Sequence, residues 1–301
     1  MRQHKLSLCK EHYLEWLPEQ TERFIQKYNM FTHKDKVLVA VSGGKDSLTL
    51  WEILWKSGYV ADGLYINLGI DGQTKYSEMS RQIVLDFARE RALRFTVVDV
   101  EEEFRETVPQ IAARTLRGKA KPCSVCGLVK RHIMNRVARD AGYNILATGH
   151  NLDDEAAALF GNTLSWAKGY LIRQNPVLES IHPGVIKKVK PFFRFYERET
   201  AAYAVLSRIT YVYDECPYSI GSKTIYYKGL LNQLEADRPG AKLHFFLAFL
   251  KAKKEGLFAQ PPEKCGLELK TCPVCGQPTT VPDTCAFCRM MDKVKSPTVK
   301  G

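Results

Sequence analysis

Apolar runs and helical repeats alternate along the first half of the chain. The run KVLVAV at 36–41 is apolar and β-branched without alternation, which is typical of a strand buried on both faces. The residues from Leu48 to Gly58 have the apolar spacing of a helix that ends at a glycine. Further strands are predicted at 61–70, 94–100 and 144–149, and further helices near 77–91, 104–115, 124–141 and from Asp153 onward. This alternation predicts an α/β fold in which helices cover both faces of a parallel sheet.

The second half continues with a mixed pattern. Strands are predicted at 185–193 and 209–215, and helices at 196–207, 223–235 and 240–255, in addition to one near the start at 15–29. The segment QPPEK at 260–264 is expected to be a linker, because consecutive prolines end helices and stiffen the chain.

Charge narrows the class of partner. Among 301 residues, 44 Lys plus Arg exceed 33 Asp plus Glu and give a net charge of +11, which favours a polyanionic partner. No apolar run approaches the roughly 20 residues that span a membrane. The first residues, MRQHKLSLCKEH, lack the apolar core of a signal peptide, so we expect a cytoplasmic protein with no membrane partner.

Nine cysteines in such a chain indicate metal or redox chemistry rather than disulfides. Their odd number excludes complete pairing within one chain. Four form a C-terminal cluster, two form an isolated C-x-x-C, and three stand singly; in that order they are Cys272, Cys275, Cys285 and Cys288, then Cys123 and Cys126, then Cys9, Cys216 and Cys265.

The stretch SGGKDS, from Ser42 to Ser47, lies between a predicted buried strand and a predicted helix. Open α/β sheets bind ligands at this position, and the N–H groups of a glycine turn and a helix start cradle anions. Lys45 adds a positive charge and Asp46 a carboxylate for Mg²⁺. A tight turn that binds nothing is the alternative. The Walker pattern is absent, so hydrolysis of the usual P-loop kind is not supported.

This stretch resembles the PP-loop of the N-type ATP pyrophosphatases, which have a HUP-like core. Those enzymes cleave ATP between the α and β phosphates and adenylate a substrate. ATGHNLDDEA at 147–156 resembles the second signature of the family. The resemblance implies that Asp154 lies near Mg²⁺ or the catalytic centre. It implies contacts with ATP for Ala40, Val41, Ser42, Gly43, Gly44, Lys45, Asp46, Ser47, Ile66 and Gly149.

Cys123 and Cys126 place two thiols on one turn, and Cys216 is the other lone cysteine of the core. Three readings fit this spacing. The pair could be buried or dithiol cysteines unrelated to Cys216, or part of a zinc site with a distant ligand. Three thiolates could instead hold a [4Fe–4S] cluster with one iron free to bind sulfide.

Several ordered segments resemble the tRNA thiolation branch of the PP-loop proteins, the TtcA/TtuA family. They are PCSVCGLVKRHIMNRVAR, ATGHNLDDEAAALFGN, VKPFFRFYERETAAYA and YVYDECPYS, within residues 36–255. The resemblance implies that Cys123, Cys126 and Cys216 hold a [4Fe–4S] cluster. It also implies a catalytic role for Lys130, which the helical spacing places on the same face as Cys126.

The C-terminal motif C-x2-C-x9-C-x2-C can supply four thiolates to one tetrahedral zinc ion. It consists of Cys272, Cys275, Cys285 and Cys288. A segment this short has little core of its own, so metal binding is expected to supply most of its folding energy. The motif also resembles the C-terminal zinc finger of the TtuA type.

LCKEHYLEW near the start resembles the second half of an N-terminal zinc finger with Cys9 and His12 as ligands. The first C-x-x-C of such a finger is missing, and only His4 precedes Cys9 as a further ligand. The start could be truncated, the site could have decayed, or other ligands could complete it. We expect three parts: an N-terminal segment at 1–35, a PP-loop thiolation core at 36–260 and a C-terminal zinc finger at 261–301.

No acidic residue occurs from Thr107 to Arg139. As a group, the cations of this segment could bind phosphates and steer tRNA toward Cys123 and Cys126, although a solvated basic helix face is the alternative. The cations are Arg114, Arg117, Lys119, Lys121, Lys130, Arg131, Arg136 and Arg139.

The resemblance implies an ATP-dependent tRNA 2-thiouridine synthetase that acts on the T-loop uridine. ATP would adenylate the uridine C2 oxygen, and sulfur would replace it with release of AMP. The resemblance also implies a ubiquitin-like sulfur carrier with a C-terminal thiocarboxylate and a possible homodimer. The alternatives are a wobble-uridine or cytidine thiolase, a PP-loop amide or lysidine synthetase without a cluster, and a non-catalytic zinc-dependent RNA-binding protein.

Overall fold

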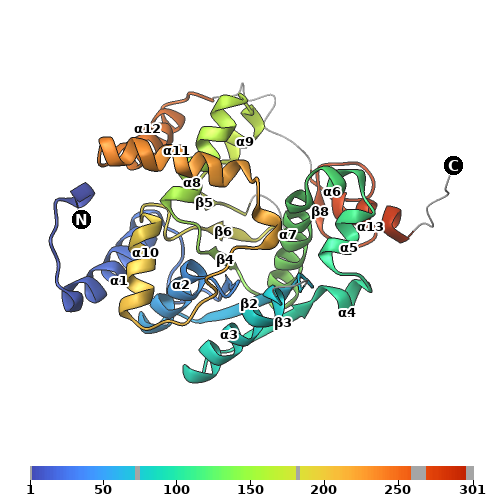
Figure 1. Ribbon diagram of the computed structural model, residues 1–301. Coiled ribbons are helices and arrows are strands. Elements are labelled where there is room, and N and C mark those ends of the chain that lie inside the picture. The colour runs from blue at the N-terminus through green and yellow to red at the C-terminus, as the bar shows by residue number, and fades with distance from the viewer. Residues whose placement is uncertain (1, 72–74, 181–183, 259–268, 296–301) are drawn as a thin grey trace.

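The computed structural model describes residues 2–71, 75–180, 184–258 and 269–295. These residues form a central sheet flanked by helices, with a small C-terminal unit at one side (Figure 1). The linker predicted at 260–264 and Cys265 lie outside the described residues.

Six strands form the sheet in the order β3-β2-β1-β4-β6-β5, and all neighbours are parallel except the edge strand β5. The strands are β1 (Val37–Ala40), β2 (Ala61–Asn67), β3 (Phe95–Asp99), β4 (Ile145–Thr148), β5 (Val177–Leu178) and β6 (Lys187–Val189). Ala40, the last residue of β1, pairs with Leu64 on one side and Thr148 on the other. The carboxyl ends of β1 and β4 therefore lie together, where open α/β sheets place their ligands.

Nine longer helices and several short ones surround the sheet in the described residues. The longer helices are α1 (Lys10–Lys27), α2 (Lys45–Lys56), α3 (Tyr76–Glu90), α7 (Pro122–Asp140), α8 (Leu152–Leu164), α10 (Glu197–Leu206), α11 (Lys223–Asp237), α12 (Ala241–Lys254) and α13 (Ala286–Lys295). The shorter elements are η1 (Arg2–His4), α4 (Val100–Phe104), α5 (Val108–Ala113), α6 (Leu116–Ala120), α9 (Lys168–Arg173) and η2 (Pro217–Ser219).

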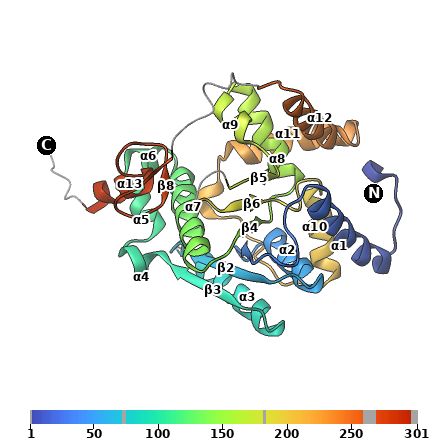
Figure 2. The same ribbon diagram turned by 180° about the vertical axis from the view of Figure 1, so that it is seen from behind.

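Alternate residues of β1 enter two different cores. Val37 and Val39 lie in the large apolar core that also contains residues of α1, α2 and α10. Leu38 points the other way and packs with Leu146 and with Ala138 of α7. Figures 1 and 2 show the sheet between α7 on one side and α2 and α10 on the other. The predicted α/β fold with a doubly covered sheet is confirmed, because both faces bury apolar side chains.

The helix predicted near 104–115 is present but shorter than expected. Only α5 lies inside these bounds, because α4 ends at Phe104 and α6 begins at Leu116. Arg105 ends α4 in the left-handed region at φ 63°, a conformation that stops a helix. Thr107 then starts α5 through a capping box with Gln110, and Thr115 accepts a hydrogen bond from the N–H of Gly118 to start α6. Capping threonines thus divided a segment whose apolar spacing alone indicated one helix.

The strand predicted at 209–215 is also wrong, because this segment joins no sheet. Its backbone donors find partners elsewhere: the N–H of Ile209 bonds to Ala204 at the end of α10, and that of Val212 bonds to the carbonyl of Gly43 at 2.9 Å. The β-branched and aromatic pattern therefore marks an extended segment that crosses the glycine turn, not a strand. The strand predicted at 185–193 is shortened to β6, and a turn follows it.

The C-terminal unit shares its core with the main body. Its short strands, β7 (Lys270–Thr271) and β8 (Pro278–Thr279), pair antiparallel and precede α13. Phe287 stacks on His132 of α7 with ring centroids 3.7 Å apart, and the Gln277 side chain donates to the His132 carbonyl at 3.0 Å. Burial lowers the pKa of His132 to about 4, so the stacked ring is neutral. The unit therefore packs on the helix that carries Cys123 and Cys126.

The N-terminal helix α1 belongs to the main core, where Leu17 and Ile25 are fully buried. Tyr13 donates a hydrogen bond to the carbonyl of Glu199 on α10. The three-part division of the chain stays a prediction, and its boundary at 260 falls outside the described residues.

Candidate nucleotide and metal sites

The SGGKDS segment forms a tight turn between β1 and α2. Gly43 adopts φ 80°, which few other residues tolerate, and Gly44 is the N-cap of α2. Ser47 Oγ accepts a hydrogen bond from the Ser42 N–H at 3.1 Å and donates to the Gly44 carbonyl at 3.0 Å. The turn is therefore held in shape by its own serines, with the start of α2 directed into the space beyond β1. This geometry presents N–H groups and a positive helix end to an anion.

A cavity of about 410 Å³ opens at this edge of the sheet. Ten of the residues predicted for nucleotide binding or catalysis line it: Ala40, Val41, Ser42, Gly44, Asp46, Ser47, Ile66, Lys130, Gly149 and Asp154. Gly43 and Lys45 are not among the lining residues. Sequence reasoning missed Tyr76, Ser80, Met134 and His150, which complete the wall from α3, α7 and the end of β4.

The SGGKDS turn and Gly149 of the ATGHNLDDEA segment lie in close contact. A Cβ on Gly149 would lie 2.8 Å from the backbone carbon of Asp46 and 2.9 Å from the N of Ser47. A Cβ on Gly43 would lie 3.0 Å from the carbonyl oxygen of Ser80. Both contacts are to backbone atoms, which cannot move aside as a side-chain end can. The glycines are therefore needed for close approach of the turn to its neighbours.

Lys45 points away from the cavity and into a network of charges. Its Nζ lies 3.0 Å from Asp46 Oδ2 and 2.7 Å from Glu197 Oε1. On the other side of Glu197, Lys228 lies 3.0 Å from Oε2 and 2.6 Å from Asp154 Oδ1. Glu197 of α10 thus links two lysines, and each lysine also holds one of the two carboxylates that line the cavity.

Burial raises the pKa of Asp46, whereas Lys45 and the Thr200 hydroxyl partly offset this. Burial would also raise the pKa of Glu197, but Lys45 and Lys228 outweigh it and hold the pKa at about 2. Glu197 is therefore ionised, and Lys45 and Lys228 keep their protons because burial is outweighed by their carboxylate partners, which raise both pKa values.

Glu197→Gln is expected to raise the KM for Mg-ATP up to about tenfold while leaving kcat within about twofold. The substitution removes two partly exposed ion pairs, each worth roughly 0.2–1 kcal/mol, and leaves Asp46 and Asp154 as the remaining carboxylate partners of Lys45 and Lys228. Steady-state release of pyrophosphate at varied ATP measures both constants. Glu90→Gln, an exposed ion-paired glutamate on α3, is the matched control. An unchanged KM would contradict the role of Glu197.

The three core cysteines converge beside this cavity. The thiol of Cys123 donates to the Tyr218 carbonyl at 3.4 Å, which joins the start of α7 to the loop that holds Cys216. Burial raises the pKa of Cys216, the Tyr218 N–H lowers it, and the neighbouring Cys126 and Cys123 raise it while Lys130 lowers it. Cys126 and Cys216 are half-buried against an apolar core, and Cys123 is exposed.

This arrangement fits a three-cysteine cluster site better than a single-ion site. The three sulfurs do not form a group within 4.8 Å of one another, a distance that a single ion requires, whereas the C-terminal cysteines do. An iron–sulfur cluster is larger than one ion, so its ligands stand further apart. Cys123 and Cys126 both lie close enough to Cys216 to raise the pKa of its thiol, and three thiolates would leave one iron of a cluster without a protein thiol.

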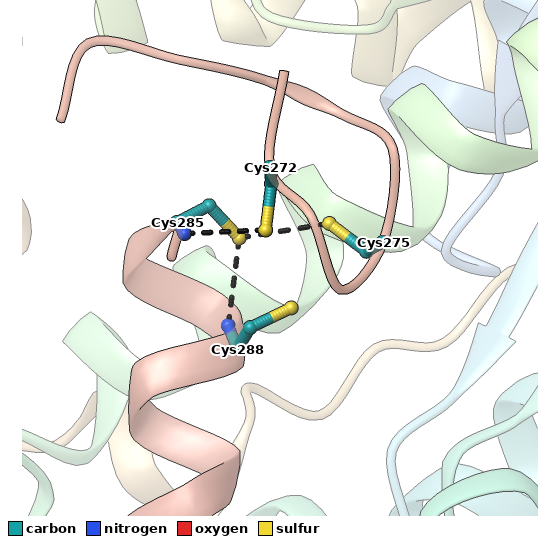
Figure 3. A group of neighbouring side chains, drawn as sticks. All are labelled: Cys272, Cys275, Cys285 and Cys288. Carbon is teal, nitrogen blue, oxygen red and sulfur yellow. Dashed lines mark hydrogen bonds between the residues drawn. The ribbon is translucent and has the colours of Figure 1, made fainter. Parts of the chain in front are cut away.

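The C-terminal cysteines form a closed group of four. Cys272 and Cys275 come from the loop after β7, and Cys285 and Cys288 come from the start of α13 (Figure 3). Cys275 Sγ lies 3.7 Å from Cys285 Sγ. Two sulfurs of a tetrahedral site with metal–sulfur bonds of roughly 2.3 Å are expected to lie about 3.8 Å apart. Burial raises the pKa of Cys272, but backbone N–H groups outweigh it and lower the pKa to about 6. The group therefore suits one metal ion held by four thiolates.

The structure does not complete the site predicted at Cys9 and His12. Cys9 Sγ lies 3.0 Å from His12 Nδ1, and both are exposed. His4, the remaining candidate, places Nε2 2.8 Å from Glu199 Oε1. The described residues contain no group of three ligand atoms at this place. Metal binding here stays a prediction.

The acid-free segment 107–139 splits into two kinds of cation. Arg114 pairs with Glu106, Arg136 with Glu103 and Arg139 with Asp140. Lys130 instead lines the cavity. Arg117 and Arg131 are exposed, and neither has a carboxylate within 4 Å among the described residues. The segment is therefore not one uniform basic face, because acidic residues flanking it neutralise part of it.

A strand, a glycine turn and a helix start that together border a cavity are typical of a nucleotide-binding α/β protein. A family model described as the PP-loop domain matches residues 17–221. The tRNA-5-methyluridine(54) 2-sulfurtransferase of Thermus thermophilus is 48% identical over 98% of this chain and 88% of the relative. That of Thermotoga maritima is 40% identical over 98% of this chain and 93% of the relative.

Among solved structures, the U34-tRNA thiolase NcsA from Methanococcus maripaludis with its [4Fe-4S] cluster is similar at a TM-score of 0.73 and 25% identity. The alignment covers 88% of this chain and 87% of that one. The chain belongs to the PP-loop family of tRNA 2-sulfurtransferases. No helix in the described part of the chain is long and apolar enough to cross a membrane.

Proposed function

We propose that this protein catalyses ATP-dependent 2-thiolation of 5-methyluridine 54 in tRNA, with a [4Fe–4S] cluster on Cys123, Cys126 and Cys216. The observation that carries the proposal is the position of Lys130. Lys130 lines the nucleotide cavity and also lies close enough to Cys216 to lower the pKa of its thiol. An activated nucleoside and a sulfur source could therefore meet at one wall. The target nucleoside of this proposal is the one on which the two similar 2-sulfurtransferases are named as acting.

ATP would bind with its β and γ phosphates at the Ser42–Ser47 turn, where N–H groups of the α2 start donate to phosphate oxygens. Asp46 and Asp154 face the same cavity and would hold Mg²⁺. Apolar Ile66 and Met134 line the rest of the cavity and suit the adenine ring. The α phosphate would then lie between the turn and the Lys130 wall.

The uridine O2 would attack the α phosphorus, forming an O–P bond as pyrophosphate leaves, and the N3 proton would pass to solvent. A sulfur nucleophile would then bond to C2, the C2–O2 bond would break, and AMP would leave with the former uridine oxygen. Lys130 would stabilise negative charge on the phosphate oxygens and on the incoming sulfur. The cluster, when bound, would supply an iron without a protein ligand at which exogenous sulfur can bind.

The sulfur donor of this proposal is a ubiquitin-like carrier with a C-terminal thiocarboxylate, the donor that the family resemblance implies. A homodimer and a cytoplasmic location are likewise carried from the sequence as predictions. Sedimentation velocity of the purified protein measures the oligomeric state.

Formation of AMP and pyrophosphate tests the proposal at its first step. Purified protein with its cluster, Mg-ATP, tRNA and sulfide as the sulfur source is expected to release equal amounts of AMP and pyrophosphate, and this release is expected to depend on tRNA. Formation of ADP and inorganic phosphate would contradict the proposed function. So would release of AMP and pyrophosphate at the same rate with and without tRNA. An RNA-binding protein without catalysis would form neither AMP nor pyrophosphate.

We propose zinc for the C-terminal group of four cysteines. Cys272→Ser is expected to lose one equivalent of zinc and to lower Tm by more than about 5 °C, because the lost metal binding is worth several kcal/mol and each is worth about 2–4 °C in a larger domain. Elemental analysis and calorimetry measure the two effects. Val274→Ser, at an exposed residue between Cys272 and Cys275 that offers no metal ligand, is the matched control. Unchanged zinc content in Cys272→Ser would contradict the assignment.

A further inference from the structure

Four cations from four separate elements lie around the start of α7, and none of them has a carboxylate within 4 Å in the described part of the chain. We call them the basic cluster: Arg117 of α6, Arg131 of α7, Arg173 of α9 and Lys188 of β6. Sequence reasoning grouped the first two with the acid-free segment 107–139 and missed the other two. The three arginines are exposed, and Lys188 is half-buried.

Arg117 and Arg131 lie over the first turns of α7. The Arg117 Nε donates to the hydroxyl of Ser124, the residue that follows Cys123. The Arg131 guanidinium folds back toward Gly127, with Nη1 3.1 Å from the place that a Cβ on this glycine would occupy. Both cations therefore sit beside the cysteines of this helix.

Lys188 and Arg173 approach the same place from the sheet and from α9. Lys188 pairs with Leu146, whose side chain packs against α7, so neighbouring strands place both side chains on that face. Burial and the nearby Arg131 lower the pKa of Lys188 to about 8. Arg173 holds its guanidinium 5.4 Å over the exposed ring of Tyr170. Burial lowers the pKa of Arg131, and Arg117 and Arg173 lower it further.

Like charges gathered in this way repel one another, and a bound polyanion removes the repulsion. The contrast with Arg114, Arg136 and Arg139 is direct, because each of these has its own carboxylate. We propose that the basic cluster binds phosphates of the tRNA backbone and holds the target loop beside Cys126. Arginine is suited to phosphate because its planar fork can donate two parallel hydrogen bonds. This inference rests on the proposed function for the identity of the polyanion.

Binding of an unmodified tRNA transcript without ATP tests the inference. Arg173→Gln and Lys188→Gln are each expected to lower the slope of log K against log[KCl] by about one, and to weaken binding at 0.1 M KCl roughly tenfold. The double variant Arg173→Gln/Lys188→Gln is expected to show the sum of the two changes in slope and in binding free energy. Fluorescence anisotropy between 50 and 200 mM KCl, conditions at which a few phosphate contacts already change affinity strongly, measures them. Thermal melting of each variant checks that it is folded.

Two arginines with carboxylate partners serve as matched controls. Arg139→Gln removes a cation of α7, the helix that carries Arg131, and Arg89→Gln removes an exposed cation of α3. Both are expected to keep the affinity within about twofold and the slope unchanged. Equal losses in the controls, or an unchanged slope in the double variant, would overturn the inference. So would full tRNA affinity combined with a loss of sulfur transfer from a protein donor, because the cluster would then face an acidic protein.

The inference and the proposed function fail in different ways. Variants of Lys130 or Asp154 that bind tRNA but form no thionucleoside would leave the basic cluster intact. Wild-type protein that binds tRNA through the basic cluster but releases no AMP would contradict the proposed function alone.

Discussion

Cys216→Ala is expected to abolish tRNA thiolation while leaving the affinity for ATP within about twofold. Cys216 stands on the loop between α10 and η2 and approaches Cys123 and Cys126 from outside their helix. Its loss leaves two thiols of one turn, which cannot enclose a cluster with a single open iron. Cys216 does not line the cavity beside the Ser42–Ser47 turn, where we propose that ATP binds, so nucleotide binding is expected to persist.

Iron and sulfide analysis after anaerobic reconstitution measures the cluster, and mass spectrometry of the tRNA product measures thiolation. Cys9→Ala is the matched control for iron, since Cys9 is exposed, precedes α1 and does not line the cavity. We expect the control to keep full iron content and activity. Full thiolation by Cys216→Ala would remove this cysteine from the cluster site.

Gly149→Ala is expected to weaken ATP binding at least tenfold and to destabilise the protein by about 1–3 kcal/mol. The added Cβ would lie 2.8 Å from the backbone carbon of Asp46, so either the turn or the end of β4 must move. Movement of the turn would displace the N–H groups of the α2 start from the place where we propose that the phosphates bind. The weaker ATP binding and the lower stability both follow from the overlap of this Cβ with the backbone of Asp46.

Calorimetric titration with a non-hydrolysable ATP analogue measures the affinity, and denaturant unfolding measures the stability. Gly229→Ala is the matched control, because a Cβ on this helical glycine meets no atom within 4 Å. An alanine there is expected to be neutral or to stabilise α11 by up to about 1 kcal/mol. If Gly149→Ala bound the ATP analogue with normal affinity, close contact between Gly149 and the Ser42–Ser47 turn would not be needed for ATP binding.

Features encoded within a short window were predictable from the sequence. The turn at Ser42–Ser47 and the cysteines Cys272 to Cys288 each occupy fewer than about 20 residues, so their spacing alone indicates a phosphate cradle and a metal knuckle. Helix and strand alternation predicted the sheet for the same reason. The convergence of Cys216 with Cys123 required the family resemblance, because about 90 residues separate them.

Features that depend on packing between distant elements were not predictable. Glu197 and Lys228 look like ordinary charges of helix surfaces in the sequence, and only the packing of α10 and α11 brings them to Asp46 and Asp154. Arg173 joins the start of α7 in the same way. The segment at 209–215 has the pattern of a strand, yet its donors bond to a helix end and to Gly43. The sequence pattern shows which residues are apolar, but it does not show which groups their backbones hydrogen-bond to.

Mass spectrometry of tRNA nucleosides tests the central claim most directly. Cells that lack the protein are compared with cells that express the wild type or Cys216→Ala. The proposed function predicts that 2-thio-5-methyluridine disappears without the protein, returns with the wild type and does not return with Cys216→Ala, while other thionucleosides persist. Loss of wobble 2-thiouridine or of thiocytidine instead, or an unchanged profile, would contradict it.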